Sequence, residues 1–425
     1  MRTWPTGGLW RHPDFLKLWS AETISVFGSQ VGQLALPLVA VIVLGSTPFE
    51  VAALGTISFL PFILFTLPAG VWVDRMRRRP ILIAGDLGRF VLLTTVPVAY
   101  VFDALTIWQL YVVGFSVGIC TVFFDVAYQS YLPSLVARDQ LVEGNSKLEI
   151  SRSAAQMAGP GVGGILVQLL TAPYAILTDA LSFLGSGLFL LGIRKGEQLP
   201  KREEGAPHPS MVREAREGLA YVLGNRYLRS IAACTAISNF STSLAFGIFL
   251  VYAVRVLDLS PAVIGLVFSL SSIGSLVAAL TATRISARLG VGPTIVATAF
   301  IFGPSLLLIP AAPQSAPIPF LVASGLLLGF GAVTYNITQV SFRQAICPER
   351  MQGRMNSVMR FIVWGVMPIG SLLGGALATW IGLRETMWIG AVIGSVSFVP
   401  VLISPVRTLR EMPEPVPAEP AVELA

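Results

Sequence analysis

Long apolar stretches separated by short polar segments run along almost the whole chain. A helix needs roughly 20 apolar residues to cross the hydrocarbon core of a bilayer, which is about 30 Å thick. Twelve stretches reach that length, so the pattern predicts an all-α membrane protein with twelve transmembrane helices. The predicted spans are 16–44, 49–72, 81–101, 106–130, 146–170, 173–193, 227–254, 260–283, 294–311, 317–340, 355–380 and 386–404.

One long polar interruption divides these spans into six and six. We expect an N-terminal six-helix bundle over 1–193, a cytoplasmic linker over 194–226, a C-terminal six-helix bundle over 227–404 and a cytoplasmic tail over 405–425. The tail is rich in Pro and Glu, a composition typical of disordered segments.

The linker contains MVREAREGLAYVL, in which apolar side chains recur at helical spacing. Met211, Ala215, Leu219 and Leu223 share one face, and charged side chains occupy the other. This pattern is typical of an amphipathic helix that lies along a membrane surface. The helix is expected to be a spacer between two bundles, and a binding site for a regulator is the alternative.

Composition excludes a soluble globular protein, because 54% of the residues are hydrophobic and only 12% are charged. With the N-terminus inside, all but three of the 29 Lys and Arg residues fall in cytoplasmic segments or at cytoplasmic helix ends. The exceptions are Arg89, Arg255 and Arg384. The positive-inside rule therefore predicts a multi-pass protein of the cell membrane with both termini cytoplasmic. The net charge of +6 then needs no nucleic-acid partner.

The chain shows no pattern of an enzyme or a cofactor protein. Its three cysteines and two histidines are too scattered for a disulfide framework or a metal site. A phosphate-binding loop of the G-x-x-x-x-G-K-S/T type does not occur in the sequence. We therefore expect no enzymatic activity, no cofactor and no metal.

A faint internal repeat relates the two predicted bundles. The matching residues lie 213 or 211 positions apart: Pro48 and Pro80 with Pro261 and Pro293, Asn145 and Ser146 with Asn356 and Ser357, and Gly163 and Gly164 with Gly374 and Gly375. Parallel repeats of this kind are typical of transporters whose substrate path lies between the halves, near the middle of the membrane.

Charge is concentrated in GVWVDRMRRRP, residues 70–80. Gly70, Asp74, Arg75 and Arg78 resemble the loop 2–3 signature of the major facilitator superfamily, although Arg77 stands where that signature has Gly. The resemblance covers the whole chain and implies the major facilitator fold.

That resemblance also implies a cytoplasmic gate, formed by Gly70, Asp74, Arg75, Arg78, Asp125 and Asn356. In it, Asp74 meets the N-terminal end of the eleventh helix near Asn356, and Arg78 pairs with Asp125. A carboxylate is stabilised at a helix N-terminus, so such a contact favours one access state over the other. Positive-inside bias alone is an alternative explanation for the arginines, but not for Asp74.

A second motif lies in AQMAGPGVGGILVQ. Gly159, Pro160, Gly163 and Gly164 resemble the antiporter motif G-P-x-x-G-G of exporters in this superfamily. A Gly and Pro cluster bends a helix and allows a neighbouring helix to approach closely, which can seal one side of a pathway. Close packing without a sealing role is the alternative.

Charged side chains inside a membrane are costly, so each needs a partner or a task. Glu22 is the leading candidate for proton coupling, and Asp179 is the second. A solvated position for Glu22 near the lipid headgroups is the alternative. Asp86 and Arg89 are spaced to pair on one helix. Further inter-helix pairs are expected among Glu149, Arg152, Arg343, Arg354 and Arg360.

Two further segments, FFDVAYQSYLPSLVARDQLVEGNSKL and LTDALSF, resemble the exporter branch that contains macrolide efflux and siderophore export proteins. The resemblance implies proton-coupled efflux of a small amphipathic drug or secondary metabolite by alternating access. We expect a monomer in the bilayer. An apolar cargo would suit the hydrophobic and aromatic residues Phe27, Phe59, Phe62, Phe123, Phe246 and Tyr335, and lipid-facing or packing roles for these residues are the alternative. A proton-coupled importer of a metabolite and a lipid-moving protein are the alternatives.

Overall fold

The computed structural model describes residues 8–73, 75–137, 140–194 and 211–411, and every regular element in these ranges is a helix. The first part contains η1 (Leu9–Arg11), α1 (Pro13–Leu38), the short π-helix η2 (Val39–Val43), α2 (Pro48–Val73), α3 (Arg78–Val101), α4 (Ile107–Leu135), α5 (Leu141–Leu170) and α6 (Ala172–Leu191). The second contains α7 (Met211–Gly224), α8 (Arg226–Arg255), α9 (Pro261–Leu289), α10 (Val291–Ala311), α11 (Pro317–Ile346), α12 (Glu349–Ile381), α13 (Leu383–Ser395), α14 (Val399–Leu402) and η4 (Pro405–Thr408).

Local sequence sets several helix starts. Proline is the first residue of α1, α2, α9 and α11, a position where its missing N–H costs nothing. At the start of α2, Thr47 and Glu50 form a capping box. The Thr47 N–H donates to Glu50 Oε2 (2.7 Å), and the Glu50 N–H donates to Thr47 Oγ1 (3.3 Å). These signals stop each helix from extending into the preceding turn.

Eleven helical stretches of the described residues are long and apolar enough to cross a membrane. They include Leu383–Leu402, which joins α13 and α14. Helix α5 contains the predicted span 146–170, but its glycines and polar side chains make it less apolar than the others. The all-helical membrane fold is confirmed, whereas apolarity alone supports eleven spans and not twelve.

The described chain separates into two compact units. Unit 1 comprises residues 1–203 and 250–269, and unit 2 comprises 204–249 and 270–425. The last part of α8 and the first part of α9 thus belong to unit 1, which the division predicted from sequence did not foresee. The six-plus-six division remains a prediction.

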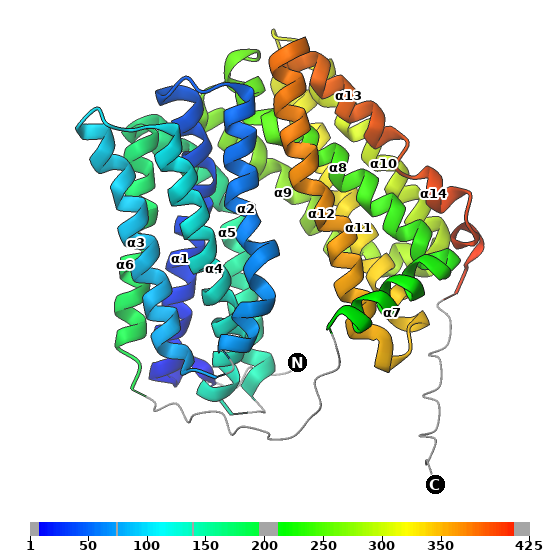
Figure 1. Cartoon of the computed structure of the whole chain (residues 1–425), viewed down its shortest axis with the longest axis horizontal. Coiled ribbons are helices and arrows are strands. Elements are labelled where there is room, and N and C mark those ends of the chain that lie inside the picture. Colours follow the sequence, from blue (N-terminus) through cyan, green and yellow to red (C-terminus); the bar gives the residue numbers. More distant parts are fainter. Residues whose placement is uncertain (1–7, 74, 138–139, 195–210, 412–425) are drawn as a thin grey trace, which may run out of the picture. The chain divides into compact units, whose positions relative to one another are not determined.

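In unit 1, α1 packs against α5 and α6, while α4 packs against α2 and α3 (Figure 1). An apolar cluster that includes Phe15, Leu82, Tyr131 and Leu190 joins several of these helices. Elsewhere large apolar side chains such as Trp108 and Leu169 are exposed, as a surface that faces lipid requires.

In unit 2, α10 packs against α11 and α13, and α12 packs against α7 and α13 (Figure 1). Helix α7 is the predicted amphipathic helix. Glu217 forms an ion pair with Arg354 of α12 (2.6 Å), and Tyr221 donates a hydrogen bond to the Ile346 carbonyl (3.3 Å). Leu219 and Leu223, on the predicted apolar face, are exposed. One face of α7 is therefore docked on unit 2, and the other remains available to lipid.

The segment after α14 differs from the expected unstructured tail. Residues 405–411 include η4, Val406 is buried, and the Gly292 N–H donates to the Leu409 carbonyl (2.8 Å). Residues 405–411 are ordered because the carbonyls of Leu409 and Arg410 accept hydrogen bonds from N–H groups at the start of α10 that have no partner within the helix. Residues 412–425 lie outside the described part of the chain.

Candidate functional site

A buried ion pair lies on α3 of unit 1. Arg89 donates to Asp86 Oδ1 (2.5 Å), and Ser186 of α6 donates to Asp86 Oδ2 (2.6 Å). The Arg89 guanidinium lies 4.4 Å from the centre of the Phe124 ring and 4.1 Å from that of Phe183. The predicted i, i+3 pair is confirmed, and the two rings add cation–π contacts.

Glu22 of α1 lies close to Arg152 of α5. Glu22 is only 5% exposed, and Arg152 Nη2 lies 3.3 Å from Glu22 Oε1. The other oxygen, Oε2, is buried without a hydrogen-bond partner among the described residues. A fully solvated position near the headgroups is therefore excluded for Glu22. The carboxyl group is half satisfied, which is unusual for a buried acid.

Arg152 also lines a cavity of unit 1, which measures about 960 Å³. Tyr128 and Gln129 of α4 and Asn145 and Glu149 of α5 belong to its wall. Arg152 thus borders an open, polar space, whereas its partner Glu22 is buried.

Asp179 of α6 is only 3% exposed and lies against α1. A Cβ atom added to Gly32 would collide with the Asp179 carboxylate, and one added to Gly28 would meet the same group at 2.9 Å. Ser182 donates to the Asp179 carbonyl (2.7 Å). The two glycines therefore make the space that this buried acid occupies.

Arg89 links these acids electrostatically. It interacts with Glu22, Asp125 and Asp179 as well as with Asp86. Asp125 of α4 also interacts with Arg152. Unit 1 therefore brings both proton candidates and one predicted gate residue into a single group of charges around two arginines.

The predicted gate is described only in part. Asp74 lies outside the described residues, and its contact with the start of α12 remains a prediction. Gly70 lies in the last turn of α2, Arg75 lies in the connection between α2 and α3, and Arg78 is the first residue of α3. The pairing of Arg78 with Asp125 also remains a prediction. Sequence reasoning missed Arg79, whose side chain donates to the carbonyls of Leu190 (3.0 Å) and Leu191 (2.7 Å) at the end of α6.

The predicted antiporter motif lies between two helices within unit 1. On one side, Gly159 and Gly163 approach α1, and a Cβ on Gly163 would lie 3.1 Å from Val31 Cα. On the other side, a Cβ on Gly164 would collide with the Pro261 carbonyl of α9. The Gly161 N–H donates to Ser269 Oγ (2.9 Å). Close helix packing is therefore observed here, while a sealing role remains a prediction.

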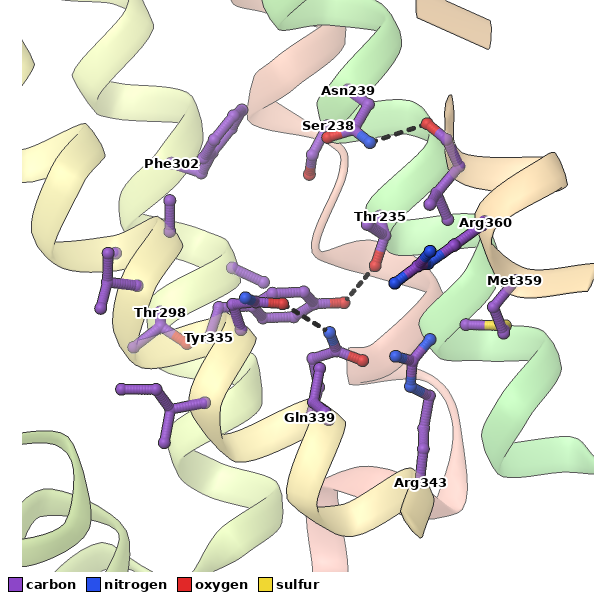
Figure 2. A pocket seen from close by; sticks show the side chains of 18 of the residues that line it. Thr235, Ser238, Asn239, Thr298, Phe302, Tyr335, Gln339, Arg343, Met359 and Arg360 are labelled. Carbon is purple, nitrogen blue, oxygen red and sulfur yellow. Dashed lines mark hydrogen bonds between the residues drawn. The ribbon is translucent and has the colours of Figure 1, made fainter. Parts of the chain in front are cut away.

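Unit 2 contains a polar cavity of about 690 Å³ between α8, α10, α11 and α12. Its polar lining includes Thr235, Ser238, Asn239, Tyr335, Asn336, Gln339, Arg343, Asn356 and Arg360. Figure 2 shows the labelled side chains among them, such as Thr235, Tyr335 and Arg360, converging from different helices. Asn356 of the predicted gate therefore lines a cavity in unit 2.

Hydrogen bonds hold much of this lining in place. One joins the Tyr335 hydroxyl to Thr235 (2.9 Å), and another runs from Gln339 Nε2 to Asn336 Oδ1 (3.1 Å) (Figure 2). Asn239 donates to the Val363 carbonyl (2.7 Å). The cavity is thus a built polar site inside an otherwise apolar bundle.

A family model for transmembrane secretion effectors matches residues 8–423. The chain belongs to this family. It is a branch of the major facilitator superfamily, so the protein is a multi-pass membrane transporter of small molecules and not an enzyme.

Relatives of this chain include efflux proteins. It is 24% identical to macrolide efflux protein A of Streptococcus pyogenes over 399 residues, which cover 93% of this chain and 97% of the relative. It is 27% identical to the multidrug efflux pump Tap of Mycolicibacterium fortuitum over 352 residues, which cover 79% and 81%. The predicted membership of the superfamily's exporter branch is confirmed.

Solved structures confirm the fold. A bacterial homologue of the iron transporter ferroportin, in its inward-facing state, matches with a TM-score of 0.73 and 18% identity over 93% of this chain and 99% of that chain. The nucleoside transporter NupG matches with a TM-score of 0.72 and 13% identity over 92% and 99%. At this identity the likeness shows the major facilitator fold alone.

The cavity of unit 2 is the part of the protein that was least predictable from sequence. Tyr335 was expected only as one of several aromatic residues, and Arg343 and Arg360 were expected in inter-helix pairs. A usable signal was present, because Asn239, Asn336 and Gln339 are amides within apolar helices. Polar residues within membrane helices generally face a cavity or a partner.

Proposed function

We propose that this transporter exports a small amphipathic compound in exchange for protons, by alternating access. The names of the relatives support efflux, because they are macrolide and multidrug efflux proteins. The proposal includes cytoplasmic termini, a monomeric protein and the proton gradient as the energy source, with no cofactor.

The observation that carries proton coupling is the Glu22–Arg152 pair. Glu22 Oε1 accepts from Arg152 while Oε2 has no partner among the described residues. A buried carboxylate is stabilised by such a cation, whereas the neutral acid is favoured when the cation withdraws. Arg152 lines a cavity, so its side chain has space to move.

The exchange can be described as a cycle. Glu22 takes a proton from the outer side, which weakens its attraction to Arg152. The protonated state favours one access state, and release of the proton to the cytoplasm restores the pair and favours the other. Cargo then leaves in the step that the proton gradient drives. Asp179 is the second group that the proton could occupy.

Drug-sensitivity tests in an efflux-deficient host examine this proposal first. Expression should raise resistance to at least one amphipathic compound, and a protonophore should abolish the increase. Inside-out vesicles then test direction and coupling. The compound should enter the vesicle lumen as protons leave it, and a pH-sensitive dye reports that movement.

The Glu22→Gln variant tests the residue assignment. It keeps the shape of the side chain but cannot lose a proton, so cargo-driven proton movement should fall to background. Asp103→Asn is the matched control, because Asp103 is an exposed acid between α3 and α4, and it should behave as the wild type. Wild-type coupling in Glu22→Gln would transfer the role to Asp179. Uptake into cells instead of export would favour a proton-coupled importer.

A further inference from the structure

The cavity of unit 2 contains two guanidinium groups. Arg343 is supplied by α11 and Arg360 by α12, and both line the cavity. Figure 2 shows the two side chains reaching into the same space, beside Gln339 and below Thr235. Among the described residues that line this cavity, none is acidic.

Another arginine of unit 2 has an acidic partner among the residues that the structure describes, whereas these two do not. Arg354, on the same helix as Arg360, pairs with Glu217 at 2.6 Å. Neither Arg343 nor Arg360 forms an ion pair with a residue of the described chain, and Arg360 only approaches the Trp364 ring, at 5.4 Å. Two cations close together repel each other, and charge inside a membrane helix bundle needs compensation. The cavity therefore has an uncompensated positive charge.

Other polar groups of the same wall are also incompletely bonded. Gln339 is only 4% exposed, and its Oε1 atom has no hydrogen-bond partner among the described residues. The Nε atom of Arg343 is likewise buried without a described partner. Buried polar groups are normally satisfied, so a bound molecule is the natural partner for these atoms. Arg343 supplies donors to such a molecule, and Gln339 supplies an acceptor.

The remaining wall is apolar. Phe302, Val333 and Trp364 line the cavity together with Met359 and Val363. At about 690 Å³, the cavity is within the size range of small-molecule binding sites. It therefore combines an apolar wall with a cationic, hydrogen-bonding end.

We propose that this cavity binds a cargo with an anionic group, a carboxylate, sulfonate or phosphate, on an apolar body. Arg343 and Arg360 hold the anion, because guanidinium groups bind oxyanions through short charge-assisted hydrogen bonds. Phe302 and Trp364 contact the apolar body. This inference rests on the proposed transport function and narrows it from amphipathic compounds in general to amphipathic anions.

Three dansyl probes of matched size test the proposal on the purified full-length protein in lipid nanodiscs. Dansylglycine carries a carboxylate, dansylglycinamide is neutral and dansylethylenediamine is a cation. Fluorescence titration should give a dissociation constant for dansylglycine about tenfold lower than that for the amide, the difference expected of one charge-assisted contact. The cation should bind more weakly still. Equal affinity for the carboxylate and the amide would overturn the proposal.

Charge reversal at Arg343 should increase the affinity for a cation, a gain that a misfolded protein would not show. Arg343→Glu should lower the affinity for dansylglycine at least tenfold and raise the affinity for dansylethylenediamine, whereas Arg343→Lys should keep the preference for the anion. Arg284→Glu is the control, since Arg284 is an exposed arginine of α9 in unit 2 that does not line the cavity. If Arg343→Glu and Arg284→Glu change the affinities equally, the preference reflects the general surface charge and the proposal is wrong.

The binding assay uses no proton gradient, so its outcome is independent of the transport assays. Anion-selective binding that depends on Arg343, without any efflux, would refute the proposed function and leave the anion site standing. Proton-driven efflux with binding that is indifferent to charge would refute the anion site and leave the function standing.

Discussion

Arg89 is a buried cation with acidic side chains on several sides. It pairs with Asp86 on its own helix, lies between two aromatic rings, and interacts electrostatically with Glu22, Asp125 and Asp179. Removing one partner of a buried pair leaves an uncompensated charge, which costs more than the pair itself contributes. Arg89 is therefore expected to be a structural centre of unit 1.

The Arg89→Met variant should unfold at a markedly lower temperature, because Asp86 would lose its cation. The expected loss is about 3–5 kcal/mol in the free energy of unfolding. The double variant Asp86→Asn with Arg89→Met should recover part of that loss, since it also removes the carboxylate that Arg89→Met leaves without its cation. Thermal unfolding of the purified proteins measures the effect. A double variant no more stable than Arg89→Met would show that packing and not charge causes the loss.

The glycines of α5 allow its neighbouring helices to pack closely against it, because glycine has no side chain. Gly159 and Gly163 face α1, while Gly164 faces Pro261 and Gly265 at the start of α9. A side chain at these positions would keep the helices apart. The helices can approach α5 this closely because glycine has only a hydrogen atom where other residues have a side chain. Small residues have the same effect at the interfaces of other membrane helix pairs.

Gly164→Ala should destabilise the protein by about 1–3 kcal/mol, the usual cost of overpacking, because the new Cβ would collide with the Pro261 carbonyl. Gly353→Ala on α12 is the matched control, since a Cβ there meets nothing within 4 Å. In an exposed helical position this control should be neutral or slightly stabilising. Melting temperatures of both variants test the expectation, and an unchanged value for Gly164→Ala would contradict it.

The start of α5 also anchors η1. Lys147 hydrogen-bonds to Glu143 Oε1 (2.9 Å), and the Leu9 N–H donates to the same oxygen (3.1 Å). The Lys147 hydrogen bond, with help from Leu9, lowers the pKa of Glu143 below its ordinary value of 4.5. A lowered pKa in the folded state means that this carboxylate stabilises the fold above about pH 4.5, and that its contribution disappears as the pH falls through the lowered value.

Glu143→Gln should therefore have a lower melting temperature than the wild type at pH 7, and the difference should shrink as the pH falls below 4.5. Glu149→Gln is the control, since Glu149 is an exposed acid on the same helix. A difference between wild type and Glu143→Gln that is independent of pH would refute the assigned role of the charge.

At the scale of the whole molecule, orientation is the property that gives the proposed cycle its direction. The connection between α2 and α3 is expected inside the cell, and the connection between α3 and α4 outside. Exposed residues mark both connections, Arg75 on the first and Asp103 on the second. Arg75 is therefore expected on the cytoplasmic side of the membrane and Asp103 on the outer side.

Single cysteines at these positions test the orientation, in a background without Cys120, Cys234 and Cys347. A membrane-impermeant thiol reagent should label Asp103→Cys in intact cells and Arg75→Cys only after the cells are permeabilised. The reverse pattern would place both termini outside and would reverse the proposed directions of cargo and protons.

Much of the fold was predictable because it depends on local properties. Span length and hydropathy predict the helices, Pro and the Thr47–Glu50 capping box mark their starts, and Asp86–Arg89 is determined by spacing on one helix. The candidate site was less predictable. Glu22 and Asp179 were expected to be functional acids, but the sequence could not show that Arg152 meets one and that Gly28 and Gly32 make space for the other.

The sequence by itself determined a helical membrane protein, because the length of its apolar stretches is a local property. Its motifs added the resemblance to the major facilitator superfamily, which is likewise readable from short segments of sequence. Only the tertiary structure decided which charges are compensated. Arg152 and Arg354 were both expected in inter-helix pairs and form them, with Glu22 and Glu217, whereas Arg343 and Arg360 line a cavity without an acidic residue among its described lining. The reason is physical: an ion pair exists only where two helix faces meet, and that meeting depends on the packing of the whole bundle.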